Sequence, residues 1–240
     1  FLFFLIHTSM TADKRKYGFR RAFTLRPHLL KGMLSISGWT MVQSFISVSI
    51  WFIFFLAIEH LGERPLAVTN IVRNISALLI MVISAFATTA GALISNQIGA
   101  GEQRCLFKTC GMTLKLTYAI LIPLLIILCL FPEPVLRAFT DSPSLIAASV
   151  NSVYVMASST LIMAPSFILF NAVSGTGNTK AGFIMEMISL AVYTAVIYYG
   201  IIRLKPDVAL CWFSEHVYGV TLIILAWWYL KSGKWRGKKV

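Results

Sequence analysis

The sequence contains little charge and few cysteines. Only 12% of its 240 residues are charged, 58% are hydrophobic and the mean hydropathy is +0.78. Soluble domains contain about 25% charged residues, and a soluble fold could not hide this much apolar surface. The four cysteines form no disulfide framework, and no His/Cys group has the spacing of a metal site. These shortages exclude a soluble domain and a small disulfide-linked scaffold, and they predict an integral membrane protein.

The sequence also begins without a methionine or a secretory leader. Its first residues read "FLFFLIH", and the basic charge follows the apolar run instead of preceding it, so we do not expect this stretch to be a signal peptide. We interpret residues 1–10 as the end of a preceding transmembrane helix, and we expect the chain to be part of a longer one. No nucleophile–base pair points to an enzyme, and we expect no cofactor beyond a transported proton or sodium ion.

Long apolar runs are what the sequence does contain. A membrane-spanning helix needs about 20 such residues, and the period-2 alternation of barrel strands is missing. The fold class predicted is an all-α polytopic membrane protein with six transmembrane helices. The expected spans are 33–58, 66–95, 109–131, 144–171, 181–202 and 208–230.

The basic residues gather on one side of these spans. If the loop before the first span is cytoplasmic, 16 of the 21 Lys and Arg residues lie inside, as the positive-inside rule requires. We therefore predict a basic cytoplasmic loop at 11–32, a six-helix lobe at 33–230 and a basic cytoplasmic tail at 231–240, in a multi-pass protein of the cell (inner) membrane. The net charge of +12 favours anionic membrane lipid as a partner. We expect no nucleic acid partner, because these charges lie in the loops between membrane spans.

Two glycine-rich turns join consecutive spans on the predicted inner side. They read "SNQIGAGEQ" at 95–103 and "FNAVSGTGNTKAGF" at 170–183. The second has glycine, hydroxyl and lysine residues, but a phosphate loop needs four residues between its glycines and Lys-Ser/Thr directly after. We expect a tight turn at Gly175 and Gly177, with Asn178 or Thr179 capping the next helix.

Together with "LAIEHLGERPLAVTNIVRNIS" at 56–76, these two turns resemble the MATE family, the multidrug and toxic compound extrusion transporters. The resemblance implies twelve spans in two six-helix lobes, of which this chain matches the C-terminal lobe. It implies cation-coupled (proton or sodium) efflux of organic, often cationic, drugs or toxic compounds by alternating access. The partners implied are a small organic substrate and the missing N-terminal lobe of the same protein.

Polar residues inside the spans are candidates for a substrate cavity. Gln43 and Ser47 lie one turn apart and share a helix face, and Asn74, Asn151 and Tyr154 offer further amide and hydroxyl groups. The alternative for such residues is a hydrogen bond between packed helices. A transporter needs polar groups on a cavity face, because lipid does not tolerate them.

Glu186 is a candidate coupling or substrate-binding residue, because an acid inside a span is costly and is a functional candidate by default. The alternative is a carboxylate stabilised by the helix N-terminus and by water, since Glu186 lies about two turns from the inner end of its span. We assign Glu215 to the acids at the outer ends. The resemblance implies a cation-binding glutamate in the seventh span and an aspartate in the tenth. Ser47 occupies the first of these places and the second has no acid, so the family's C-lobe cation site is expected to be absent and coupling to rest on the missing lobe.

Two alternatives to drug efflux stay open. A lipid-linked oligosaccharide flippase of the same superfamily would line its cavity with basic residues, whereas the spans contain Arg73, near the outer side, and Lys115, near the inner side. In a non-transporting membrane scaffold the polar residues would face neighbouring helices without converging on one cavity.

Overall fold

The computed structural model describes residues 27–233 and 235–236. The expectations for 1–10, for most of 11–32 and for half of the tail at 231–240 lie outside the described residues. Within the described ranges the chain is helical and contains no β-strand. The elements are α2 (Pro27–Glu59), α3 (Glu63–Gly99), η1 (Gln103–Cys105), α4 (Leu106–Leu130), α5 (Pro132–Arg137), α6 (Pro143–Gly175), α7 (Thr179–Val196), the π-helix η2 (Ile197–Arg203), α8 (Val208–Cys211) and α9 (Ser214–Ser232).

Six helical segments are long and apolar enough to cross a membrane, which confirms the predicted fold class. They are Ser37–Glu59, Glu63–Gly99, Gln103–Leu130, Pro143–Gly175, Thr179–Arg203 and Val208–Ser232. Two details differ from the sequence prediction. The helix α2 begins at Pro27, inside the segment expected to be a loop, since proline is favoured in the first turn of a helix. The last span is interrupted at Trp212 and Phe213, between α8 and α9.

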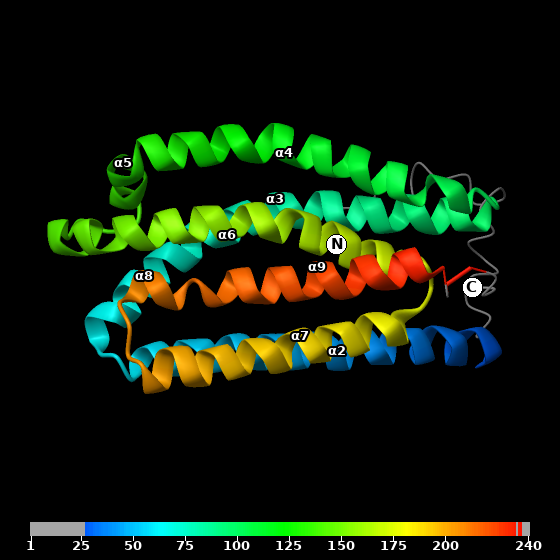
Figure 1. The fold of residues 1–240 in the computed structure, drawn as a ribbon, viewed down its shortest axis with the longest axis horizontal. Helices are drawn as coiled ribbons and strands as arrows, with labels where there is room; N and C mark the ends of the chain where they lie inside the picture. The colour runs from blue at the N-terminus through cyan, green and yellow to red at the C-terminus, as the bar shows by residue number, and fades with distance from the viewer. Residues whose placement is uncertain (1–26, 234, 237–240) are drawn as a thin grey trace, which may run out of the picture. The chain divides into compact units, whose positions relative to one another are not determined.

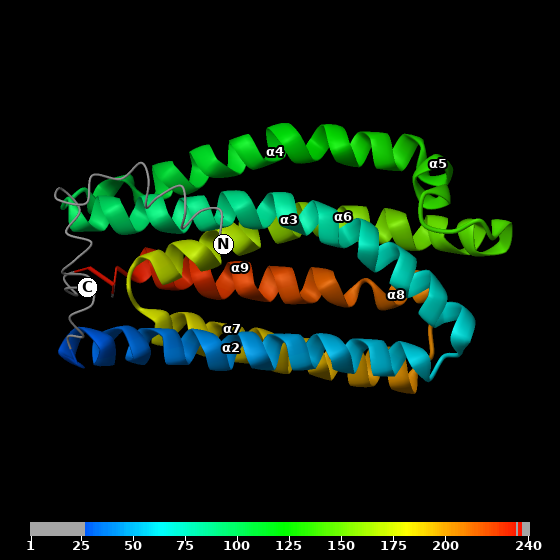
Figure 2. The same cartoon turned by 180° about the vertical axis from the view of Figure 1, so that it is seen from behind.

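The spans over residues 39–240 pack in a defined order (Figures 1 and 2). The helices α3 and α6 pack against each other, and α4 packs on both of them. On the other side α2, α7 and η2 share an apolar cluster that includes Phe54, Ile58, Tyr193 and Ile197. The helix α9 contacts both α6 and α7 and so joins the two sides.

The α3–α6 contact is made by small residues. A Cβ placed on Gly175 would lie 2.5 Å from the carbonyl oxygen of Gly91, and one on Gly91 would lie 3.0 Å from the carbonyl oxygen of Asn171. The backbones can approach this closely because glycine has no side chain. Buried Ala87, Ala90 and their neighbours continue the contact as one apolar cluster.

The turn from α6 to α7 has the predicted form. Gly177 adopts a positive φ of 79°, a conformation that glycine reaches without strain. Asn178 is the N-cap of α7, and its side chain accepts a hydrogen bond from the backbone N–H of Ala181. Its Nδ2 also donates to the hydroxyl of Tyr229, at 2.6 Å, which fastens the turn to α9. The prediction of a tight, capped turn is confirmed.

Candidate functional site

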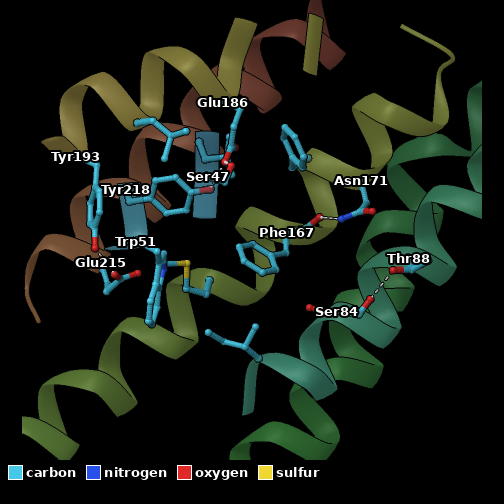
Figure 3. A pocket seen from close by; sticks show the side chains of 15 residues that line it. Ser47, Trp51, Ser84, Thr88, Phe167, Asn171, Glu186, Tyr193, Glu215 and Tyr218 are labelled. Carbon is cyan, nitrogen blue, oxygen red and sulfur yellow. Dashed lines mark hydrogen bonds between the residues drawn. The ribbon is translucent and has the colours of Figure 1, made fainter. Parts of the chain in front are cut away.

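A cavity of about 330 Å³ lies within the spans, among α2, α3, α6, α7 and α9 (Figure 3). Its walls are mainly apolar and aromatic, with a few polar groups. The lining residues are Ser47, Trp51, Ile80, Ser84, Thr88, Met163, Phe167, Phe170, Asn171, Glu186, Leu190, Tyr193, Glu215, Tyr218 and Leu222. An apolar cavity with a small number of oriented polar groups has the general character of a small-molecule site.

Glu186 on α7 is one of these polar groups. Its side chain is 4% exposed, and its Oε1 accepts two hydrogen bonds. The Ser47 hydroxyl donates one from α2, at 2.8 Å, and the Tyr218 hydroxyl donates the other from α9, at 2.9 Å (Figure 3). Three helices therefore meet at this carboxylate.

Glu215 on α9 is a second buried carboxylate at the same cavity. It is 7% exposed, and its Oε1 accepts a hydrogen bond of 2.7 Å from the hydroxyl of Tyr193. The sequence analysis assigned Glu215 to the acids at the outer ends, but it belongs to the span Val208–Ser232, so Glu186 is not the sole acid within a span. Glu215 precedes Tyr218 by three residues, so the two share the face of α9 that lines the cavity.

The two carboxylates form a crossed arrangement. Glu186 and Tyr193 lie two turns apart on α7, while Glu215 and Tyr218 lie one turn apart on α9. Each glutamate is held by the tyrosine of the opposite helix, and the two tyrosine rings meet edge to face with their centroids 5.7 Å apart. The two helices are thus joined by two reciprocal Glu–Tyr pairs.

The carboxylates have no positive partner in the cavity. No lysine, arginine or histidine lines it in the part of the chain that the structure describes. A buried charge without a partner is costly in a membrane, so it is neutralised by a bound cation or by a proton. The chemistry that this cavity can perform is the reversible binding of positive charge.

Of the five residues predicted to line a substrate cavity, Ser47 lines this one. Gln43 lies one turn before it on α2, half-buried and outside the lining, while Asn74 and Asn151 are exposed. The hydroxyl of Tyr154 faces the carbonyl oxygen of Cys129 on α4, at 3.4 Å. For these four residues a substrate role stays a prediction, whereas Glu186, the candidate coupling residue, lies in the cavity.

Comparison with known proteins gives the family. The MatE family model matches residues 40–199, about two thirds of the chain. The chain belongs to the MatE family. It is thus a multi-pass membrane protein with a transporter fold. The search of curated proteins found no match.

Solved MATE structures share this fold. The MATE transporter VcmN of Vibrio cholerae in its bent form superposes with a TM-score of 0.76 at 16% identity, covering 89% of this chain and 50% of that one. An outward-facing multidrug resistance MATE transporter gives 0.75 at 13% identity, with coverages of 85% and 46%. A MOP superfamily transporter from Pyrococcus furiosus gives 0.73 at 14% identity, with coverages of 83% and 44%. The chain therefore spans about half the length of these MATE and MOP transporters.

Proposed function

We propose that this chain is the C-terminal lobe of a MATE transporter of the cell (inner) membrane. The complete transporter exports organic, often cationic, compounds in exchange for protons or sodium ions, by alternating access. The observation that carries the proposal is the cavity inside the spans, which contains two buried carboxylates and, among the described residues, no basic group in its lining.

The walls of the cavity suit an organic cation. Trp51, Phe167 and Phe170 supply aromatic surface from α2 and α6, and Tyr218 supplies a further ring from α9. An aromatic face attracts a cation by about 0.5–2 kcal/mol. A hydrophobic cation therefore finds both apolar contact and a counter-charge in one place.

Glu186 is the proposed coupling residue of this lobe. The family's own cation-binding positions were expected to be empty here, and Ser47 replaces one of them. In this chain Ser47 donates instead to Glu186, so the carboxylate reaches the cavity from α7. A negative charge at this position can be taken by the transported cation and by the coupling ion in turn, which is what exchange requires.

The flippase alternative depends on the sign of the charge in the cavity. The Pyrococcus furiosus relative is described as a transporter whose reversed binding-pocket polarity suggests a different function, so pocket polarity is the property to compare. A pyrophosphate-bearing lipid needs basic groups, whereas the charged groups of this cavity are Glu186 and Glu215. Arg73 is exposed on α3 and stacks on the ring of Phe55, outside the cavity lining.

The test is transport by the complete protein in proteoliposomes. We expect tetraphenylphosphonium to be exported under a proton or sodium gradient, and Trp51→Ala to reduce its apparent affinity about tenfold, which corresponds to about 1.4 kcal/mol. Trp228→Ala is the matched control, because Trp228 is exposed and outside the cavity lining. Movement of a polyprenyl diphosphate lipid without any cation transport would contradict the proposal in favour of the flippase.

A further inference from the structure

We propose that Glu215, held by Tyr193, is a second cation-binding carboxylate of this lobe, so that the cavity takes two positive charges, one at Glu186 and one at Glu215. The ligands are monovalent cations: a proton, a sodium ion or the charged group of an organic cation. The inference rests on the proposed function. It adds Glu215 as a binding residue and sets the number of bound positive charges at two.

Burial without compensation is the first argument. The groups that face the cavity are two carboxylates and two phenols from α7 and α9, and neutral polar or apolar side chains from the other helices. The polar ones among the latter are Ser47 on α2, Ser84 and Thr88 on α3, and Asn171 on α6. The described lining contains no basic side chain to pair with Glu215. An ionised Glu215 inside the spans is therefore stable only when a cation from outside binds to it.

A free oxygen is the second argument. Among the described residues the donor on the Glu215 carboxylate is the Tyr193 hydroxyl, which bonds to Oε1. Oε2 is left without a donor, although the side chain is more than nine-tenths buried and lines the cavity (Figure 3). An oriented carboxylate with an unused oxygen at a cavity wall has a position ready for a ligand cation or a proton.

The neighbouring histidine does not supply the missing charge. The Nε2 of His216 lies 2.9 Å from the hydroxyl of Ser158 on α6, and its ring stacks on that of Phe213, with centroids 4.7 Å apart. His216 is not among the residues that line the cavity, whereas Glu215 is. The consecutive residues Glu215 and His216 therefore lie in different environments, and only Glu215 lines the cavity.

The separate hydroxyl donors of the two carboxylates favour two charges over one shared charge. Tyr193, the partner of Glu215, lies seven residues beyond Glu186 on α7, which corresponds to about 10 Å along the helix axis. The rings of Tyr193 and Tyr218 meet edge to face, so each pair contributes one ring to the contact. Each carboxylate thus has its own hydroxyl donor and its own place for a cation.

The experiment counts ions in the complete transporter, reconstituted in proteoliposomes with tetraphenylphosphonium as the exported probe. Ion flux per exported cation is measured under a proton gradient and, separately, under a sodium gradient. We expect Glu215→Gln and Glu186→Gln each to remove one positive charge from the cycle, and the double variant to abolish coupling. Glu133→Gln is the matched control, because Glu133 is an exposed acid on α5.

The measured ion number and affinity show which cation binds at Glu215: a proton, a sodium ion or the organic cation. A smaller ion number in Glu215→Gln under one gradient identifies that ion as the ligand. A tenfold loss of tetraphenylphosphonium affinity with an unchanged ion number identifies the organic cation instead. An ion number and an affinity equal to those of the wild type would overturn the inference. A wild-type protein that moves no cation would defeat the proposed function itself, and so is distinguishable.

A second variant keeps the test independent of folding. Glu215→Asp retains the charge but withdraws it from Tyr193, so it should keep the wild-type ion number with a changed affinity. Loss of an ion in this variant would show that the effect comes from a disturbed helix contact and would contradict a binding role for the charge.

Discussion

Two helix contacts, α3–α6 and α7–α9, are formed by different kinds of residue. Between α3 and α6 the helices meet through glycine and alanine, with Gly175 directly against the backbone of Gly91. Between α7 and α9 they meet through hydrogen-bonded polar pairs: Asn178 with Tyr229, Glu186 with Tyr218, and Tyr193 with Glu215. Both contacts lie within the same lobe.

The difference indicates what each contact is for. Close packing of small residues is a source of helix association in a membrane, where the surrounding lipid is as apolar as the helices. Buried carboxylates have a cost there and are kept for a function. We therefore interpret the α3–α6 contact as the fixed part of the lobe and the α7–α9 contact as the part that binds ligands.

The largest expected effect is a loss of stability when the α3–α6 contact is disturbed. Gly175→Ala places a Cβ 2.5 Å from a backbone oxygen, closer than real Cβ atoms approach, so α3 and α6 have to separate. We expect a loss of stability of about 1–3 kcal/mol, as for overpacked cores. Thermal unfolding of the detergent-solubilised protein measures it.

Gly111→Ala is the matched control for that prediction. Gly111 lies within α4, and a Cβ there meets nothing within 4 Å. Because alanine is the better helix former by about 1 kcal/mol, this variant should be as stable as the wild type or more stable. Equal destabilisation by the two substitutions would mean that the Gly91–Gly175 contact has no special role.

A smaller effect is expected from the binding side. Tyr218→Phe keeps the ring but removes one of the two donors to Glu186. The Tyr218 hydroxyl stabilises the Glu186 carboxylate while no cation is bound, so removing this hydroxyl should tighten cation binding. For a hydrogen bond to a charged group the expected gain in affinity is about tenfold. The apparent affinity for the coupling ion measures the change, with Tyr198→Phe, an exposed tyrosine of η2, as control. Weaker ion binding in Tyr218→Phe would reverse the role assigned to this hydroxyl.

The fold could be predicted from the sequence far better than the site. Span length and hydropathy are properties of single segments, so six spans and the capped turn at Asn178 follow from local patterns. The cavity depends on which faces of five helices meet. Glu215 was assigned to the acids at the outer ends, although it lies within the predicted span 208–230. Its burial follows from the pairing with Tyr193 on another helix, and no pattern within one segment records that contact.

The smallest effect is expected at Tyr154, which was predicted to line a substrate cavity and lies outside the lining of the cavity described above. Its hydroxyl lies 3.4 Å from the carbonyl oxygen of Cys129, and the side chain is 43% exposed. Hydrogen bonds between membrane helices contribute about 0.6 kcal/mol on average, so Tyr154→Phe should lower stability by no more than about that amount and leave export unchanged. Parallel measurements of unfolding temperature and tetraphenylphosphonium export in Tyr154→Phe and Tyr218→Phe check this, since only the second touches the cavity. Reduced export in Tyr154→Phe at unchanged stability would place Tyr154 on the substrate path, although it lies outside the lining of the cavity described above.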